Sequence, residues 1–543
     1  MIMLVCFLPV LFCCLFIGNN MDYNASLKPD LVVPGWLVAV CAIIAAFAMI
    51  IILLYTMKKP MSKKGDLLCS FLFRVLTFGL VLVSNKIARE IAFFLPWDID
   101  VVRGAALSLV HGQGSPDQTY FSIYTNNIPI VYILAKILEF SNAHGYSLHE
   151  EFIWVQVNCV LMSLAVFFQA MIIKRLTGNL FATLTAFFSG AILIGSSGWK
   201  IAAYTDTYGQ LFPILCIYFY ICFAQSEKQI KRYIFLALSS LSALAGGFIK
   251  PNIMLMLIAI VMTMVMEVIL YPQRKPIHCV FLIIVSGILL FGFKTYQKTI
   301  PDKIGVSLVE NIAAAPAEYF YMGLNEAHTG SYNGEDVTVY GEFQFEPAKE
   351  RDKVVMGRAI ERIRERGVVG TLYFWLRKMT MTFNDGTFGW SGEVWNNGYY
   401  YPVVSSDTPL TDFLRSIYWK GPRSAKFGTV CQCVWYFVLI GIPGCAIALF
   451  KKRNQQHIVF VISFLGVFFY QLLFEARARY LFCFLPVIIC VSILGYIQYA
   501  YILKDKGIRI DGLFKADKRC KFESKLSNIE LMSAKADKGC KDE

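Results

Sequence analysis

The sequence contains little charge. Acidic and basic side chains make up only 16% of its 543 residues, whereas a soluble domain carries about 25%. This scarcity argues against a chain of about two to four soluble domains, which its length would otherwise suggest. The apolar side chains, 57% of the total, stand in long blocks. Blocks of roughly 18 to 25 apolar residues cross the hydrocarbon layer as helices, and these blocks lack the alternation of a membrane β-barrel.

The longest polar stretch of the sequence, residues 296–429, lacks cysteine, although the chain has 16 cysteines. Nearly all of them lie inside apolar blocks or near the C-terminus. This distribution excludes a disulfide framework, and only Cys431 and Cys433 are close enough in sequence to suggest a metal site. We interpret the cysteines as small apolar residues of membrane helices.

The excess of basic residues gives a net charge of +13, which in a soluble protein would suggest a nucleic-acid partner. Here the lysines and arginines are spread over short loops between apolar blocks, where they set the membrane topology. We therefore predict no nucleic-acid partner, and an all-α polytopic protein of about eleven transmembrane helices surrounded by membrane lipid. The predicted spans are 33–57, 68–95, 152–173, 178–197, 208–224, 232–248, 252–271, 277–295, 430–450, 457–474 and 480–503.

Basic clusters predict the orientation of these spans. One cluster follows every odd-numbered span, so a single topology places all of them in the cytoplasm. The lysine-rich tail, residues 504–543, is then cytoplasmic as well. The apolar segment 1–20 is a signal-like segment, a twelfth span, or an extension upstream of a start at Met21. The clusters begin at Lys58, Lys174, Lys228, Arg274, Lys451 and Lys504.

Two large loops of the transmembrane domain, which we place at 21–503, are predicted on the outer side of the plasma membrane: 96–151 and 296–429. In the first loop, residues 128–140 are apolar but too short to span, so we predict a helix lying on the outer surface. In the second loop, residues 348–366 and 368–383 predict helices, of which the latter lies against the membrane. An aromatic-rich region, residues 383–401, follows.

Acidic side chains gather at the outer ends of the spans. Asp98 and Asp100 follow the second span, Asp206 precedes the fifth, and Glu475 follows the tenth. A carboxylate at the membrane rim could act as a general base toward an acceptor hydroxyl. Asp98 and Asp100 could instead share a divalent metal such as Mg²⁺ or Mn²⁺, or could simply end a helix in water.

Basic side chains at the outer ends depart from the usual excess of lysine and arginine in the cytoplasm. They are Arg103, Lys250, Arg477 and Arg479. A phosphate group in the outer leaflet would account for them, because arginine and lysine pair well with phosphate. Alternatively, they pair with the nearby acids and lock the helix ends.

Several short motifs occur in the order found in a known superfamily. They resemble the GT-C superfamily of membrane glycosyltransferases, especially bacterial relatives of the protein O-mannosyltransferases and aminoarabinose transferases. The resemblance extends from about residue 68 to residue 503. The motifs are Trp97-Asp98 with Val102 and Ala106, Tyr124-Thr125-Asn126-Asn127-Ile128-Pro129, Tyr204-Thr205-Asp206-Thr207, Ile249-Lys250-Pro251 and Glu475-Ala476-Arg477-Ala478-Arg479-Tyr480.

This resemblance implies a GT-C type fold and an extracytoplasmic transferase that moves a sugar from a polyprenyl-phosphate donor to a hydroxyl of a cell-envelope acceptor, with inversion. Asp98 would be the base, and the loop from Asn384 to Trp390 would cover the sugar, unless it is an interfacial aromatic belt. The other implied site residues are Asp100 beside the base and, in donor or acceptor binding, Asp206, Lys250, Arg477, Arg479, Arg103, Tyr124 and Asn127.

Two other functions fit a chain with many spans. A transporter or flippase of lipid-linked saccharides would carry ionisable groups near the bilayer midplane and paired interrupted helices. The sequence has few such groups, although Arg74, Lys86, Arg89 and Glu90 crowd the second span. A polysaccharide polymerase would use basic residues of its outer loops more than an acid after the second span.

Overall fold

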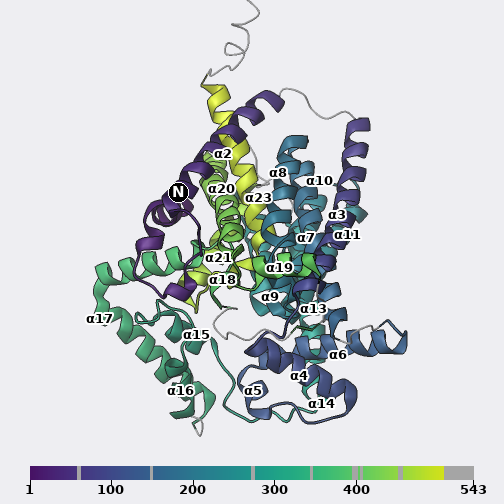
Figure 1. Cartoon of the computed structure of the whole chain (residues 1–543), viewed down its shortest axis with the longest axis vertical. Coiled ribbons are helices and arrows are strands. Elements are labelled where there is room, and N and C mark those ends of the chain that lie inside the picture. The colour runs from purple at the N-terminus through teal and green to yellow at the C-terminus, as the bar shows by residue number, and fades with distance from the viewer. Residues whose placement is uncertain are drawn as a thin grey trace, which may run out of the picture.

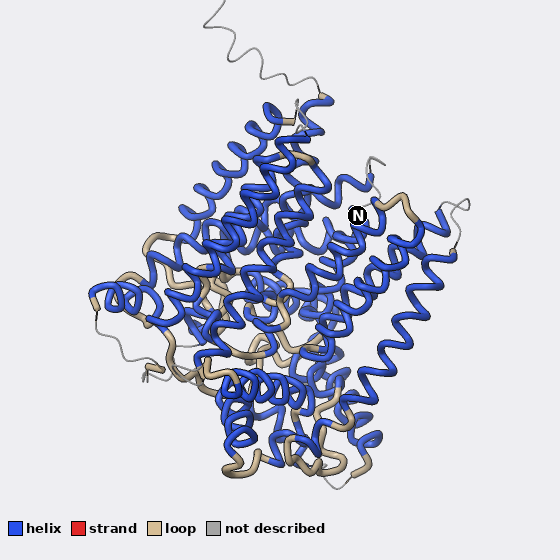
Figure 2. Tube along the Cα trace, turned by 90° about the vertical axis from the view of Figure 1, so that its right-hand side faces the viewer, coloured by secondary structure: helices blue, strands red, loops and turns tan. Residues whose placement is uncertain are grey.

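The computed structural model describes residues 1–57, 63–146, 151–270, 276–342, 346–393, 402–403, 408–450 and 457–506. Across these residues the chain is helical, and its one β-bridge joins Phe93 to Pro402. Figure 2 shows long helices joined by short loops. The predicted all-α fold class is therefore confirmed. Most of the predicted tail, residues 507–543, and several basic clusters, such as the one at Lys451, lie outside the described residues.

Within the described residues, ten helical segments are long and apolar enough to cross a membrane, and two more are apolar but shorter. All eleven predicted spans are apolar helices. The shorter two are α8 (Leu180–Gly190), continued by a wider turn to Gly195, and α21 (His457–Leu473). The long ones are α1 (Ile2–Phe12, continued to Asn20), α2 (Gly35–Thr56), α3 (Lys63–Ile91), α7 (Phe152–Thr177), α9 with α10 (Thr205–Tyr208 and Leu211–Gln225), α11 (Gln229–Ile249), α12 (Leu255–Leu270, preceded by a turn from Pro251), α13 (Ile277–Gln297), α20 (Ser424–Phe450) and α23 (Leu485–Asp505).

Small residues let the central helices approach each other closely. A Cβ atom on Gly495 of α23 would lie 1.8 Å from the Gly441 carbonyl oxygen of α20, and one on Gly444 would lie 2.4 Å from the Gly495 carbonyl oxygen. In lipid the hydrophobic effect does not drive helices together, so close packing of this kind is a main source of helix–helix association. In the apolar stretch of α23, 83% of the helix is buried inside the molecule, so α23 forms the centre of the bundle.

The N-terminal helix α1 packs into the same body. Phe7 is 1% exposed and meets the rings of Phe383, Phe464 and Phe468 at 5.7, 5.1 and 6.3 Å between centroids. The Tyr436 hydroxyl donates to the Cys14 carbonyl oxygen at 2.7 Å. The first twenty residues therefore make intimate contacts with α17, α20 and α21, and their role as a further membrane span stays a prediction.

The two large loops lie at one end of the molecule. Figure 1 shows α4 (Asp98–His111), α5 (Gln118–Ile123), α6 (Ile128–Ala143) and α14 (Ile300–Lys303) at the lower end, while α23 ends at the top. The predicted surface helix at 128–140 is α6, which lies across the ends of the long helices. Which membrane face this end occupies stays a prediction.

The long second loop forms a small helical unit of its own. It contains α15 (Pro316–Gly323), α16 (Gly334–Glu342) and α17 (Ala348–Phe383), with a separate apolar cluster that includes Tyr321, Val355 and Phe374. The two helices predicted at 348–366 and 368–383 are the arms of α17. They meet at Gly367, which has a φ of 63°. This angle lies outside the helical region, and glycine adopts it at low cost because it has no Cβ atom. Two further short helices, α18 (Trp390–Glu393) and α19 (Pro409–Tyr418), lead back to the bundle.

Candidate functional site

Asp98 begins α4 and faces a pair of tyrosine hydroxyls. The residue before it, Trp97, has a φ of 62°, which turns the chain sharply from the end of α3 into α4. The Tyr120 hydroxyl donates to Asp98 Oδ1 at 2.9 Å, and the Tyr204 hydroxyl donates to Asp98 Oδ2 at 3.3 Å. Asp98 itself is partly exposed. Its carboxylate is thus oriented by fixed donors and still open to a ligand.

Asn127 closes this arrangement into a ring of four side chains. Its Nδ2 donates to the Tyr120 hydroxyl at 2.7 Å, and its Oδ1 accepts from the Tyr204 hydroxyl at 3.2 Å. Asn127 is 2% exposed and ends the turn that leads into α6. The structure therefore brings the predicted residues Asp98 and Asn127 together through two tyrosines that the sequence analysis did not select. Tyr204 stood in a quoted motif, but no sequence signal distinguished Tyr120.

A second charged group lies two residues after Tyr204. Asp206, 3% exposed, accepts from Lys250 Nζ at 2.5 Å and lies 3.7 Å from Arg479 Nε. Both cations also lie over the Tyr480 ring, at 5.2 Å for Lys250 and 5.5 Å for Arg479. Three predicted binding residues from three distant segments thus form one cluster, which the sequence motifs had ordered but could not place.

The two groups meet at Tyr204. Burial raises the pKa of Tyr204 well above its ordinary value, and the Asp98 carboxylate raises it further, while the Arg479 guanidinium acts in the opposite direction. Asp98 and Arg479 are therefore close enough to influence the same hydroxyl. A carboxylate that can accept a proton and a cation that can hold an anion therefore both act on one tyrosine.

Glu475 joins the cationic side of the cluster. It is 7% exposed and accepts from the Tyr480 hydroxyl at 2.6 Å. Burial raises the pKa of Glu475, Arg477 and Arg479 oppose this shift, and Asp98 adds to it. Asp98 therefore acts electrostatically on Glu475, which couples the segment from Glu475 to Tyr480 to the Asp98 network.

The long second loop holds this segment in place. The Glu475 amide donates to the Tyr319 carbonyl oxygen at 2.9 Å, and the Ala476 amide donates to the Gly330 carbonyl oxygen at 3.0 Å. Lys378 of α17 is fully buried, and its Nζ donates to the carbonyl oxygens of Gly323, Leu472 and Phe474 at 2.6, 3.0 and 2.6 Å. We call these contacts the Lys378 clamp. They fix the chain immediately before Glu475.

The same loop contributes an acid, Glu318, and a tyrosine, Tyr332, to the site. Glu318 is 1% exposed, and burial raises its pKa to about 8. Among the residues that the structure describes, neither of its carboxylate oxygens has a hydrogen-bond partner. Burial raises the pKa of the predicted residue Tyr124. The nearby Tyr332, Glu318 and Asp98 raise it further, in that order of size. Glu318 was missed by the sequence analysis, and its one signal was an isolated acid within an aromatic helical turn.

Asp100 and Arg103 lie apart from this cluster. The Asp100 carboxylate accepts from Arg103 at 2.7 Å, and Arg103 bridges to Glu151 at 3.0 Å. The Asp100 side chain is 53% exposed. Within the described residues no group of three or more His, Cys, Asp or Glu side chains is spaced to hold a metal ion. Asp100 therefore pairs with Arg103, and a divalent metal shared by Asp98 and Asp100 stays a prediction.

The loop from Asn384 to Trp390 is turned inward. Asp385 accepts from the amides of Thr387 and Gly389, each at 2.7 Å, which makes it part of the loop's own fold. Trp390 is 2% exposed and packs edge-on against Trp199 at 5.5 Å between ring centroids. Trp390 therefore presents no open face to a sugar ring, contrary to the sequence-based hypothesis. Residues 394–401 of the aromatic-rich region lie outside the described residues.

The fold defines a polytopic, all-helical integral membrane protein. A family model described as a conserved hypothetical integral membrane protein matches residues 1–499, and the chain belongs to this family. No curated protein matches the sequence.

Two solved structures are similar in part. One is the oligosaccharyltransferase of Archaeoglobus fulgidus, in complex with Zn and sulfate, at 10% identity and a TM-score of 0.39, covering 79% of this chain and 51% of that one. The other is apo ArnT from Cupriavidus metallidurans, at 12% identity and a TM-score of 0.30, covering 79% and 77%. The chain spans about half the length of the oligosaccharyltransferase. Likeness at these identities and TM-scores does not identify a function.

Proposed function

We propose that this protein is a GT-C type membrane glycosyltransferase that moves a sugar from a polyprenyl-phosphate donor to an acceptor hydroxyl. One observation carries the proposal: a partly exposed carboxylate, Asp98, bonds to Tyr204, and a cationic cluster, Lys250 with Arg479, is held by Asp206 two residues further along the chain. A base and an anion-binding group in one site are what displacement of a phosphate leaving group by a hydroxyl needs.

Asp98 is the proposed general base. Its carboxylate takes the proton of the acceptor hydroxyl as the hydroxyl oxygen attacks the anomeric carbon. The Tyr120 and Tyr204 hydroxyls hold the carboxylate in one orientation, so little rearrangement is needed when the acceptor arrives. Attack from the side opposite to the phosphate inverts the anomeric centre in one displacement.

The cationic cluster is the proposed phosphate site. As the bond between the anomeric carbon and the phosphate oxygen breaks, negative charge grows on the leaving phosphate. Lys250, Arg477 and Arg479 stabilise this charge, and they do so most strongly in a water-poor site. Asp206 positions Lys250 and Arg479 through its contacts with both. Tyr124, on whose pKa both Glu318 and Asp98 act, is a proposed binding residue for the donor or the acceptor.

The site is proposed to face outward from the plasma membrane, with the C-terminal tail in the cytoplasm. The basic clusters between the spans favour this topology, and α4, which begins at Asp98, lies at the end of the molecule opposite to the C-terminal end of α23. Glu310 is exposed on the second loop, so a Glu310→Cys variant should react with an impermeant thiol reagent in intact cells. Labelling only after the cells are opened would reverse the orientation.

The central test is transfer in vitro. Purified protein is given a polyprenyl-phosphate sugar and an envelope extract as acceptor, and consumption of the donor is followed. Asp98→Asn should abolish turnover while leaving thermal unfolding unchanged, and Asp302→Asn, an exposed acid at the same end, should keep full activity. Full activity of Asp98→Asn would refute the assigned base. Movement of the lipid across vesicles without donor consumption would establish a transporter instead.

A further inference from the structure

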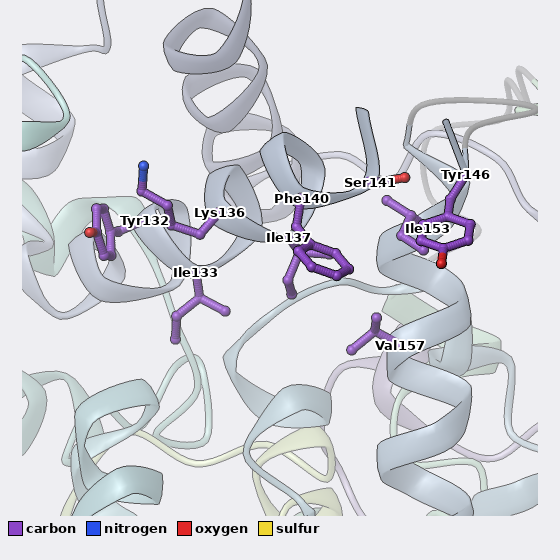
Figure 3. Close-up of a pocket in the computed structure, with 9 residues that line it drawn as sticks. All are labelled: Tyr132, Ile133, Lys136, Ile137, Phe140, Ser141, Tyr146, Ile153 and Val157. Carbon is purple, nitrogen blue, oxygen red and sulfur yellow. The ribbon is translucent and has the colours of Figure 1, made fainter. Parts of the chain in front are cut away.

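A groove lies between α6 and the first turns of α7 (Figure 3). Its volume is about 460 Å³, within the range of roughly 300 to 1,000 Å³ that is usual for ligand sites. Its walls are almost wholly apolar, with Ile133, Ile137 and Phe140 from α6 and Ile153 and Val157 from α7. We call it the α6–α7 groove. Walls of this composition suit a hydrocarbon chain and offer little to a sugar or a nucleotide.

The groove lies where a membrane lipid can reach it. Ile153 and Val157 belong to the first two turns of α7, which is one of the candidate membrane spans. The far end of the groove carries Phe140 and Tyr146, which are 61% and 65% exposed and stack with His144 between them. Exposed aromatic side chains of this kind are typical of the boundary between lipid and water.

The near end of the groove leads toward the candidate site. Tyr132 lines this end, and its hydroxyl accepts from the Tyr296 hydroxyl at 3.1 Å. The Tyr296 ring stacks on Phe248 at 6.2 Å between centroids, and Phe248 stands two residues before Lys250. Helix α6 itself begins directly after Asn127 of the Asp98 network. Aromatic contacts therefore extend from the groove to the last turn of α11, the helix that Lys250 follows.

The near end is also positively charged. Lys136 and Lys303 both lie over the Tyr132 ring, at 5.5 and 5.7 Å from its centroid. Lys136 pairs with Glu139 at 2.5 Å, whereas Lys303 also lies over Tyr296 at 4.3 Å. Cations at the mouth of an apolar groove complement a lipid that has an anionic head and a long hydrocarbon tail.

From the apolar walls, the membrane boundary, the aromatic path and the basic mouth together, we infer that the α6–α7 groove binds the isoprenoid tail of the donor lipid. This inference rests on the proposed function, because it takes a polyprenyl phosphate as its ligand. The phosphate lies at Lys250 and Arg479, the first isoprene units cross Phe248, Tyr296 and Tyr132, and the following units fill the groove. The groove thus selects donors by tail length.

The first test needs no transfer activity. The full-length protein in nanodiscs is irradiated with a polyprenyl phosphate that carries a diazirine in its tail, and the labelled peptides are identified. Label should appear on α6 and α7. Ile137→Trp, which fills the groove, should reduce it ~10-fold, because each methylene displaced from an apolar wall weakens binding. Ile288→Trp is the matched control and should label normally, because Ile288 is 67% exposed and lies on α13, away from the groove lining.

A second test uses kinetics. For Ile137→Trp the KM should rise ~10-fold for a long-tailed donor and remain unchanged for a donor of two isoprene units, whose tail ends before the groove. Val157→Phe, a milder filling, should give a smaller change in the same direction and guards against a folding defect in the first variant. If the label appears outside the groove, or if Ile137→Trp does not reduce it, the inference about the groove is wrong, even when the protein still transfers sugar. If the groove is labelled normally but no sugar is transferred, the proposed function is wrong and the groove still binds the lipid tail.

Discussion

The Tyr204 hydroxyl lies 3.3 Å from the Asp98 carboxylate, although 106 residues separate the two in sequence. Tyr204 is 7% exposed, and its one hydroxyl proton is shared between the Asp98 carboxylate and Asn127 Oδ1, so its ring cannot turn away from the carboxylate without breaking both contacts. This contact ties the first large loop to the segment that carries Asp206, and it links the proposed base to the proposed phosphate site.

The first prediction concerns this hydroxyl. Tyr204→Phe removes one of the two donors that orient Asp98, and a hydrogen bond to a charged group contributes roughly 1.5–3 kcal/mol. We expect kcat to fall ~10-fold with little change in the KM for the donor, measured by donor consumption at saturating acceptor. Tyr208→Phe is the control, because the Tyr208 hydroxyl donates to the Trp154 carbonyl oxygen outside the network. An equal loss of kcat in both variants would contradict a role for Tyr204 in orienting the base.

The second prediction separates phosphate binding from helix locking. Lys250→Met leaves Asp206 buried with only the more distant Arg479 for compensation, and breaking a buried pair costs about 3–5 kcal/mol. Asp206→Asn combined with Lys250→Met removes both charges and should restore most of the thermal stability. The KM for the donor should stay raised ~10-fold or more in the double variant, because the phosphate has lost one cation.

The control for this pair is Arg358→Met. Arg358 and Glu342 form an exposed pair at 3.1 Å, whose loss should cost less than about 1 kcal/mol. If the double variant regained a normal donor KM together with its stability, Lys250 would only lock the helix ends. That was the alternative interpretation of the basic residues in the sequence.

The sequence predicted the helices well and the site only in part. The lengths of the apolar blocks predicted the length and position of α2, α3 and the later spans directly, because a span needs a fixed number of apolar residues. The blocks did not predict the direction in which each polar side chain points. Asp98 and Asp100 looked like a pair, but in α4 they are two residues apart on a helix of 3.6 residues per turn, so they face different sides.

The contributions of the second loop could not be predicted from motifs. Glu318, Tyr332 and Lys378 reach the site only because α15 and α17 fold back against the end of α21, and this depends on contacts over more than a hundred residues, such as that between Glu475 and Tyr319. The inward turn of Trp390 has the same origin. Its aromatic character suggested a sugar platform, whereas its partner Trp199 lies in another loop.

The third prediction concerns the pH dependence of stability at Glu318. In the folded protein burial raises its pKa to about 8, whereas an unfolded glutamate titrates near 4.3. Between these values the folded state binds more protons than the unfolded state, so the free energy of unfolding falls as pH rises. Glu318→Gln should remove this decline and stabilise the protein at pH 8 by on the order of 2 kcal/mol.

Thermal unfolding in detergent between pH 5 and pH 9 checks this prediction. Glu310→Gln, an exposed acid on the same loop, is the matched control and should follow the wild-type curve. Parallel curves for wild type and Glu318→Gln across this range would show that the carboxyl group is ionised in the folded protein throughout.

The fourth prediction concerns the Lys378 clamp. Lys378→Met leaves the carbonyl oxygens of Gly323, Leu472 and Phe474 buried without their shared donor, at a cost of about 1–3 kcal/mol for each unsatisfied group before relaxation. The segment that begins at Glu475 then loses its anchor, so the arginines that follow it are held less firmly. We expect lower thermal stability and a donor KM raised more than kcat is lowered, because phosphate binding depends on these arginines.

The titration of Lys378 gives this variant a second signature. Burial lowers the pKa of Lys378 to about 7 in the folded protein, and an unfolded lysine titrates near 10.4. Between these values the unfolded state binds more protons, so the free energy of unfolding of the wild type gains with rising pH. Lys378→Met should lack this gain, whereas Lys349→Met, at the exposed start of α17, should keep it. A wild-type slope in Lys378→Met, together with an unchanged donor KM, would show that the clamp neither titrates nor positions the arginine segment.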